Sequence, residues 1–108
     1  MSQVSAINCI EVPAGHEESA RSIRDVYVDY FREQPGFVSS TFYRATIARD
    51  RINFINVVVW ESRAAYDAVV NEGFSNADGE KADGMKVLGK GFPEPIVVHP
   101  GLYEVIGS

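Results

Sequence analysis

Residues 52–61, INFINVVVWE, form the most apolar stretch of the chain and decide its fold. A run of β-branched and aromatic residues of this length, without proline or glycine, is typical of a buried strand. Because successive side chains alternate between faces, Phe54, Asn56 and Trp60 share one face of this strand. The opposite face is also largely apolar. We therefore expect a central strand with one face under helices and the other against a second subunit.

The segments on either side of this stretch complete a β-α-β-β-α-β order. The expected elements are strands at 4–12, 37–47, 52–61 and 96–106, a helix at about 16–33 and a second helix capped by Ser62. The polar tip at 48–51 is short, which favours an antiparallel hairpin between the strands it joins. Pro100 lacks an N–H, so the last strand is expected at a sheet edge. This order predicts a ferredoxin-like α+β fold, with an antiparallel sheet and both helices on one face.

Each helix is expected to bury an apolar face against the sheet. In the first helix this face comprises Ala20, Ile23, Tyr27, Tyr30 and Phe31, and charged residues, Arg21 and Arg24 among them, take the opposite face. In the second helix it comprises Ala64, Ala65, Tyr66, Ala68 and Val69. Residues 74–88 contain two Asp-Gly pairs and predict a broken helix or a lid-like loop. The other face of the sheet stays uncovered, and a homodimer is the expected way to bury it.

Length, charge and cysteine content narrow the class of protein. The 108 residues fit a single domain, 1–108. A net charge of −5 and the absence of a Lys/Arg run argue against binding to nucleic acid. The single cysteine, Cys9, excludes an internal disulfide and is typical of a reducing compartment. No signal peptide or membrane-spanning stretch is apparent, so we expect a cytoplasmic protein with no membrane partner.

Amides and aromatic residues with polar tips are the candidates for a ligand site. An amide buried without a partner costs about 1–3 kcal/mol, so Asn56 must bond a neighbouring side chain, a water molecule or a ligand oxygen. Asn8 is a second amide on an apolar face, with the same alternatives. Trp60 and Tyr66 combine an aromatic body with a hydrogen-bonding tip, although core packing is the commoner role of such residues.

No metal site is expected from the sequence. His16 and His99 lie far apart, and no cysteine or carboxylate stands near either at ligand spacing. His99 could act as a base, but an exposed or edge histidine is the commoner case. Cys9 is expected to be a small buried hydrophobic residue. No phosphate-binding glycine loop or nucleophilic serine motif is present. What remains is an apolar pocket with a few amides and phenols.

Three stretches resemble the antibiotic biosynthesis monooxygenase family of dimeric α+β barrels. They are VSAINCIEVPAGHEE at 4–18, REQPGFVSSTFYR at 32–44 and INVVVWESRAAYDAV at 55–69, within a resemblance covering about residues 4–74. For members that oxidise aromatic anthrones or quinols, the resemblance implies oxygen chemistry without metal, flavin or haem. It also implies catalytic roles for Asn56, Trp60 and Tyr66. We expect Asn8, Phe54 and Phe74 to contact the aromatic substrate.

Two other functions remain open. A haem-degrading branch of the superfamily uses an asparagine on the first strand, the strand-end tryptophan and an iron-binding histidine on the following helical segment. Asn8 and Trp60 match this pattern, but FSNADGEKADGM at 74–85 contains no histidine. The other alternative is a non-catalytic, stress-related barrel that binds a small hydrophobic ligand. The preferred hypothesis is a cofactor-independent monooxygenase that acts on a small phenolic, quinol or polycyclic aromatic substrate with O2.

Overall fold

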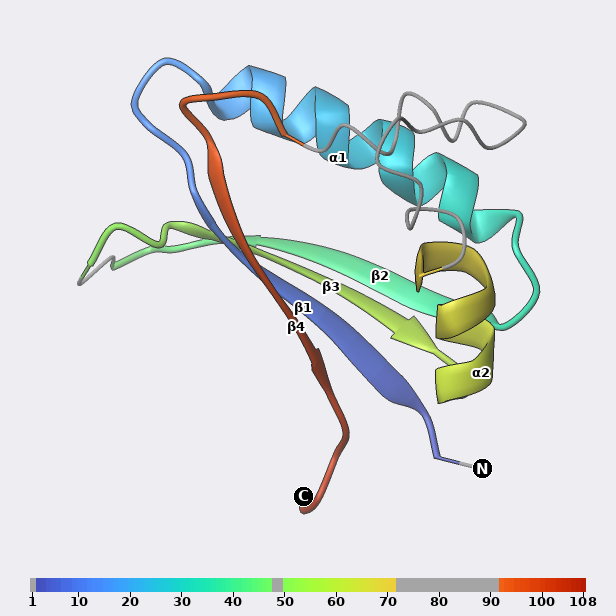
Figure 1. The fold of residues 1–108 in the computed structure, drawn as a ribbon. Coiled ribbons are helices and arrows are strands. Elements are labelled where there is room, and N and C mark those ends of the chain that lie inside the picture. The colour runs from blue at the N-terminus through green and yellow to red at the C-terminus, as the bar shows by residue number, and fades with distance from the viewer. Residues whose placement is uncertain (1, 48–49, 72–91) are drawn as a thin grey trace.

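The computed structural model describes residues 2–47, 50–71 and 92–108 (Figure 1). Its elements are β1 (Val4–Glu11), α1 (Glu17–Arg32), β2 (Phe37–Arg44), β3 (Phe54–Trp60), α2 (Arg63–Tyr66), the π-helix η1 (Asp67–Asn71) and β4 (Val97–Tyr103). This confirms the expected β-α-β-β-α-β order and the ferredoxin-like α+β fold. The broken helix or loop expected at 74–88 lies outside the described residues. No helix in the described ranges is both long and apolar enough to cross a membrane.

The four strands form one sheet in the order β2-β3-β1-β4, and every neighbouring pair is antiparallel. β3 is central and β4 is an edge strand, as the sequence predicts. β4 continues through Pro100, which lies opposite Asn8 of β1. Both helices lie on the same side of the sheet in Figure 1. We call this side the helix face and the other side the open face.

Alternation along β3 assigns its side chains to the two faces. Phe54, Asn56, Val58 and Trp60 are buried on the helix face, and Ile55, Val57 and Val59 are half-buried on the open face. Across β1 and β3, Trp60 pairs with Val4 and Phe54 with Ile10. The open face also presents Tyr43, Val97 and Tyr103, whose side chains are exposed.

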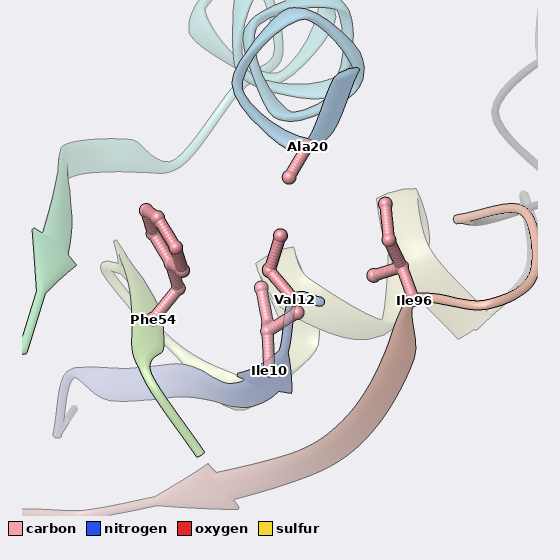
Figure 2. Close-up of a cluster of buried hydrophobic side chains, with 5 residues drawn as sticks. All are labelled: Ile10, Val12, Ala20, Phe54 and Ile96. Atoms are coloured by element: carbon pink, nitrogen blue, oxygen red, sulfur yellow. The ribbon is translucent and has the colours of Figure 1, made fainter. Parts of the chain in front are cut away.

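The helix-face core consists of two clusters, one toward each end of the sheet. The first contains Ile10, Val12, Ala20, Phe54 and Ile96. Figure 2 shows Ala20 pointing from α1 toward side chains that rise from three strands or their ends. The second contains Phe31, Val58, Trp60 and Val69. We call these the Phe54 cluster and the Trp60 cluster.

The buried side of α1 differs from the expected one at two positions. Val28 is buried beside Ala20 and Phe31. The expectation that Arg24 lies on the solvent side is wrong, because its side chain is only 12% exposed. Positions 20, 24 and 28 follow one another at a spacing of four and so share a side of the helix. From the sequence, Arg24 is expected on the solvent side only because its side chain is charged.

α2 begins as expected, at Ser62, whose Oγ accepts a 3.1 Å hydrogen bond from the Ala65 amide. The buried side formed by α2 and the following η1 is narrower than expected. Val69 is buried and Ala65 and Tyr66 are half-buried, but Ala64 and Ala68 are exposed. The helix has only four residues before the backbone widens into η1. In this wider turn, Asp67–Asn71 lie at other angles around the helix axis than they would in a regular α-helix.

Gly36, in the turn after α1, contacts the start of α2. Its φ is +91°, a left-handed conformation that favours glycine. Its carbonyl accepts a 2.8 Å hydrogen bond from the Glu61 amide. A Cβ at this position would overlap the Cβ of Ala65. The QPGF turn and the WES junction, which are separate signals in the sequence, are therefore in contact.

The side chain of Asn53 extends the sheet just before β3 begins. Its Oδ1 accepts a 2.9 Å hydrogen bond from the Val12 amide, and its Nδ2 donates a 2.8 Å hydrogen bond to the Val12 carbonyl. The amide side chain thus replaces a backbone peptide group as the partner of Val12. Because Val12 follows β1 directly, this pair prolongs the β1–β3 ladder by side-chain bonding.

Candidate functional site

Two asparagines face each other near the middle of the helix face. Asn8 of β1 and Asn56 of β3 are directly opposite in the register of the two strands. Residues so placed have Cβ atoms about 4.5–5.5 Å apart and point to the same side of the sheet. Asn56 is 7% exposed, and Asn8 is half-buried. The structure therefore brings together the two amides that the sequence places on separate apolar strands.

Arg24 of α1 binds the side chain of Asn56. Its Nε donates a 2.9 Å hydrogen bond to Asn56 Oδ1. A guanidinium group can only donate, so the Asn56 atom that faces it must be the oxygen, and Nδ2 is turned away. Within 2–47, 50–71 and 92–108, no hydrogen-bond partner of Asn56 Nδ2 is present. Asn56 is thus held at one end and has an N–H group available at the other.

Three further contacts hold the guanidinium of Arg24 in place. Nη2 donates a 3.2 Å hydrogen bond to Ser40 Oγ, and Nη1 forms a 3.1 Å ion pair with Asp25. The central carbon lies 5.1 Å from the centroid of the Phe42 ring. Ser40 and Phe42 belong to β2, so Arg24 connects α1 with two strands. Sequence reasoning missed Arg24 as a site residue. Its position four residues from both Ala20 and Val28 is the signal that could have identified it.

Trp60 is fully buried at the end of β3. Phe31 and Phe37 pack edge-on against it, with ring centroids 5.6 and 6.1 Å from the indole. Its Nε1 has no hydrogen-bond partner in the described part of the chain. Leaving a buried donor unpaired costs about 1–3 kcal/mol. The indole ring therefore packs in the core, while its N–H donates no hydrogen bond to the described residues.

Tyr66 packs against the Trp60 cluster from α2 and is half-buried. Burial raises the pKa of its hydroxyl above the usual tyrosine value, the nearby Asp67 carboxylate raises it further, and Arg63 opposes the shift. A raised pKa keeps the hydroxyl protonated at neutral pH. Tyr66 is therefore suited to donate a hydrogen bond and unsuited to act as a base.

The residues expected at the site divide into two groups. Asn8 and Asn56 face each other, and Trp60 and Tyr66 meet in the Trp60 cluster. Trp60 lies four positions after Asn56 along the strand, which corresponds to about 13 Å.

The two expected phenylalanines have different outcomes. Phe54 lies in its own cluster beyond Asn56, where its ring centroid is 5.4 Å from that of Phe42. The structure therefore places it with the packed core, beside the Arg24 contact. Phe74 lies outside the described residues.

Two surface hollows flank these groups. One, of about 380 Å³, lies between β4, the start of β1 and the start of α2, and its lining includes Val4, Ser62 and Leu102. Val4 is the register partner of Trp60, which places this hollow beside the Trp60 cluster. The other, of about 390 Å³, is lined in part by Arg24, Phe42 and Phe54. Neither hollow is lined by Asn56, Trp60 or Tyr66.

Both histidines lie away from these groups. His99 is opposite Cys9 on the open face, where its Nε2 is 2.7 Å from Glu11 Oε2. His16 immediately precedes α1. Among the residues that the structure describes, no three histidine, cysteine, aspartate or glutamate side chains are grouped to hold a metal ion.

The sequence matches the model of one protein family. The family is described as antibiotic biosynthesis monooxygenase, and the match covers residues 3–73, which is more than half of the chain. It includes β1, β3 and α2, and with them Asn8, Asn56, Trp60 and Tyr66. No curated protein matches the chain.

Several solved structures share the fold over nearly the whole chain. A protein from Shewanella loihica PV-4, provisionally assigned as a monooxygenase, has 27% identity and a TM-score of 0.76, with 100% of this chain and 99% of that one covered. SnoaB, a cofactor-independent oxygenase from Streptomyces nogalater, has 18% identity and a TM-score of 0.72, with coverage of 100% and 97%. The heme-degrading protein of Mycobacterium tuberculosis has 22% identity and a TM-score of 0.67, with coverage of 99% and 94%.

Proposed function

The chain belongs to the antibiotic biosynthesis monooxygenase family, and we propose that it oxidises a phenolic, quinol or polycyclic aromatic substrate with O2, without metal, flavin or haem. The observation that supports this most directly is the pair of donors on the helix face of β3. Trp60 Nε1 is buried and has no partner in the described residues, and the side chain of Asn56, 7% exposed, turns Nδ2 away from its hydrogen bond with Arg24. Two such groups on one strand fit a ligand that offers acceptor oxygens.

The chemistry needs an electron-rich substrate more than it needs a cofactor. A phenol or anthrone that loses a proton becomes an anion able to give one electron to O2. The resulting radicals combine to a peroxide at the ring carbon, and loss of water leaves a carbonyl group there. One oxygen atom enters the product and the other leaves as water, and the substrate supplies the electrons. The protein's task is to bind the anion, orient it and stabilise its charge.

The residue roles follow from the donors available. We assign Asn56 and Trp60 as hydrogen-bond donors to the substrate oxygens on which negative charge grows. Tyr66, protonated at neutral pH, is assigned to position the substrate near Trp60. We assign Asn8 and Phe74 to contact the substrate, and Phe54 to contact it from the hollow that Arg24 and Phe42 also line. We propose that residues 1–108 form one catalytic domain.

We also propose that the open face packs against a second copy of the chain. Half-buried Ile55, Val57 and Val59 lie along its centre, and the exposed side chains of Tyr43 and Tyr103 lie on its outer strands. A stripe of apolar side chains of this kind along the centre of the face is unfavourable in water, and a homodimer covers it with an identical surface.

Haem degradation is the less favoured alternative. An iron-binding histidine would have to approach the helix face near Trp60. His99 instead bonds Glu11 on the open face, His16 lies before α1, and the sequence contains no other histidine. The donor set therefore does not fit haem bound through histidine.

Oxygen uptake on a panel of anthrones and quinols tests the proposal. Wild type should consume O2 with at least one compound, and Asn56→Ala and Trp60→Phe should both be slower. Gln34→Ala is the matched control, because it removes an amide that lies beyond α1 and bonds the Tyr30 carbonyl. Equal rates in all four proteins would contradict the residue assignment. Thermal stabilisation by these compounds without O2 uptake would instead indicate the non-catalytic barrel, and a Soret band on hemin titration would indicate haem binding.

A further inference from the structure

We propose that Arg24 is a positioning residue that holds Asn56 as a pure hydrogen-bond donor and thereby selects substrates whose reacting oxygen is anionic. The inference rests on the proposed function for its substrate and on the structure for its geometry. The central contact is the 2.9 Å hydrogen bond from Arg24 Nε to Asn56 Oδ1.

The contact decides which end of the Asn56 amide meets a ligand. An asparagine side chain can present either its oxygen or its NH₂ group after rotation by half a turn. Rotation would leave Arg24 Nε facing an NH₂ group, so that two donors would meet and the buried guanidinium would lose a partner. A hydrogen bond from a charged group is among the more costly ones to lose. Asn56 is therefore kept with Nδ2 toward the ligand.

The contacts of Arg24 also make it a stable anchor for this purpose. Ser40 Oγ and Asp25 bind its two terminal nitrogens, and the Phe42 ring lies against its plane. The guanidinium therefore cannot follow Asn56 if the amide turns. A mobile surface arginine, such as one on the exposed side of the same helix, would not impose this restriction.

The charge of Arg24 has a second effect on the ligand. A cation bound to Oδ1 polarises the amide, and this strengthens the hydrogen bonds that the Nδ2 group donates. A cation close to the substrate also favours its deprotonated form. A hydroxyl or keto oxygen that becomes anionic gains from both effects, whereas the methyl ether of the same ring system gains from neither. The site should therefore prefer substrates with a free hydroxyl or keto group over their methyl ethers.

The first experiment observes Asn56 without any ligand. In ¹H–¹⁵N spectra of the protein, the assigned side-chain NH₂ pair of Asn56 should be dispersed and sharp. It should shift and broaden in Arg24→Met, and recover in part in Arg24→Lys, which retains a charged donor. Arg21→Met is the matched control, because Arg21 lies three residues away on the exposed side of α1. Unchanged Asn56 signals in Arg24→Met would overturn the proposal, whether or not the protein consumes O2.

The second experiment uses a substrate from the O2-uptake panel. Arg24→Met should lower kcat at least tenfold, with KM changed less than about threefold, and should move the acidic limb of the kcat profile, which reports ionisation in the bound complex, to higher pH. Above the acidic limb, where the bound substrate is already ionised, Arg24→Met should have little further effect on kcat in the Asn56→Ala background, because the amide that Arg24 orients is absent. Additive losses, or an unmoved pH profile, would show a purely structural role. If wild type is inactive while the NH₂ signals respond, the proposed function fails and the positioning contact stands.

Discussion

Gly36 and Ala65 lie so close together that position 36 has no room for a side chain. The contact brings the turn after α1 against the first turn of α2, and the hydrogen bond from the Glu61 amide to the Gly36 carbonyl holds the two segments together. Because Trp60 immediately precedes Glu61, this contact also determines where the end of β3 meets the helix that supplies Tyr66. A residue remote from the chemistry thus sets the spacing of two candidate site residues.

Gly36→Ala should lower the free energy of unfolding by more than the backbone cost alone. Gly15→Ala provides the matched control, since Gly15 has nearly the same φ, +90°, but a Cβ added on its exposed turn would meet no atom within 4 Å. The control should lose about 1 kcal/mol from the left-handed backbone conformation, and Gly36→Ala about 1–3 kcal/mol more from overpacking. Urea denaturation of both variants measures the difference. Equal losses would show that α2 moves aside at no cost.

Trp60→Phe should separate stability from turnover. The substitution keeps an aromatic ring in the cluster and removes an N–H that the described residues leave unpaired. Because the smaller ring leaves a cavity at a fully buried position, we expect the free energy of unfolding to fall by about 1–3 kcal/mol and O2 uptake to fall at least about tenfold. Phe31→Leu is the control, since it disturbs the packing against the indole while the donor remains. Loss of turnover in proportion to stability in both variants would contradict a donor role.

Tyr66 should titrate only at strongly alkaline pH. Burial and the neighbouring Asp67 raise the pKa of its hydroxyl in the folded protein. The difference in phenolate absorbance between wild type and Tyr66→Phe should therefore have a midpoint above about 10, and return to about 10 in denaturant. Because the folded state holds this proton more tightly, the contribution of Tyr66 to stability should decline as pH rises above about 10. A midpoint below about 10 in the folded protein would mean that a cation, not burial, dominates its surroundings.

Val57→Asp should convert a dimer into a monomer. Val57 is half-buried at the centre of the open face, so a carboxylate there would be buried without a partner in the proposed interface. Sedimentation velocity at micromolar concentration should show about twice the 11.9 kDa chain mass for wild type and the chain mass alone for the variant. Val26→Asp, on the exposed side of α1, should remain dimeric. A monomeric wild type would refute the proposed homodimer.

The fold could be predicted from the sequence because its main signals are local. The apolar run at 52–61 located the central strand, Ser62 marked the helix that follows, and Pro100 marked the edge strand. The strand ends were less accurate, since β2 stops at Arg44 and β3 begins at Phe54, inside the expected ranges. Strand ends depend on pairing with a neighbour, which composition does not report.

The candidate site could be predicted only in part. Alternation placed Asn56 and Trp60 on one face, but the pairing of Asn56 with Asn8 depends on the register between two strands separated by most of the matched region. The contact between Arg24 and Asn56 joins residues 32 positions apart. A rule that assigns charges to solvent excludes such a contact, since it cannot anticipate that the sheet provides an acceptor.

Because both faces of β3 are apolar, hydrophobic burial alone does not fix the register of β3 against β1. The side chains of Asn53 and Asn56 help to fix it. A shift of one residue against β1 would exchange the two sets of side chains, and hydrophobic burial alone would oppose it only weakly. Such a shifted β1–β3 pair would separate Asn53 from both backbone groups of Val12 and place a valine or isoleucine where Arg24 needs an oxygen. The contacts of the two asparagines therefore favour the observed register of β3, independently of any substrate.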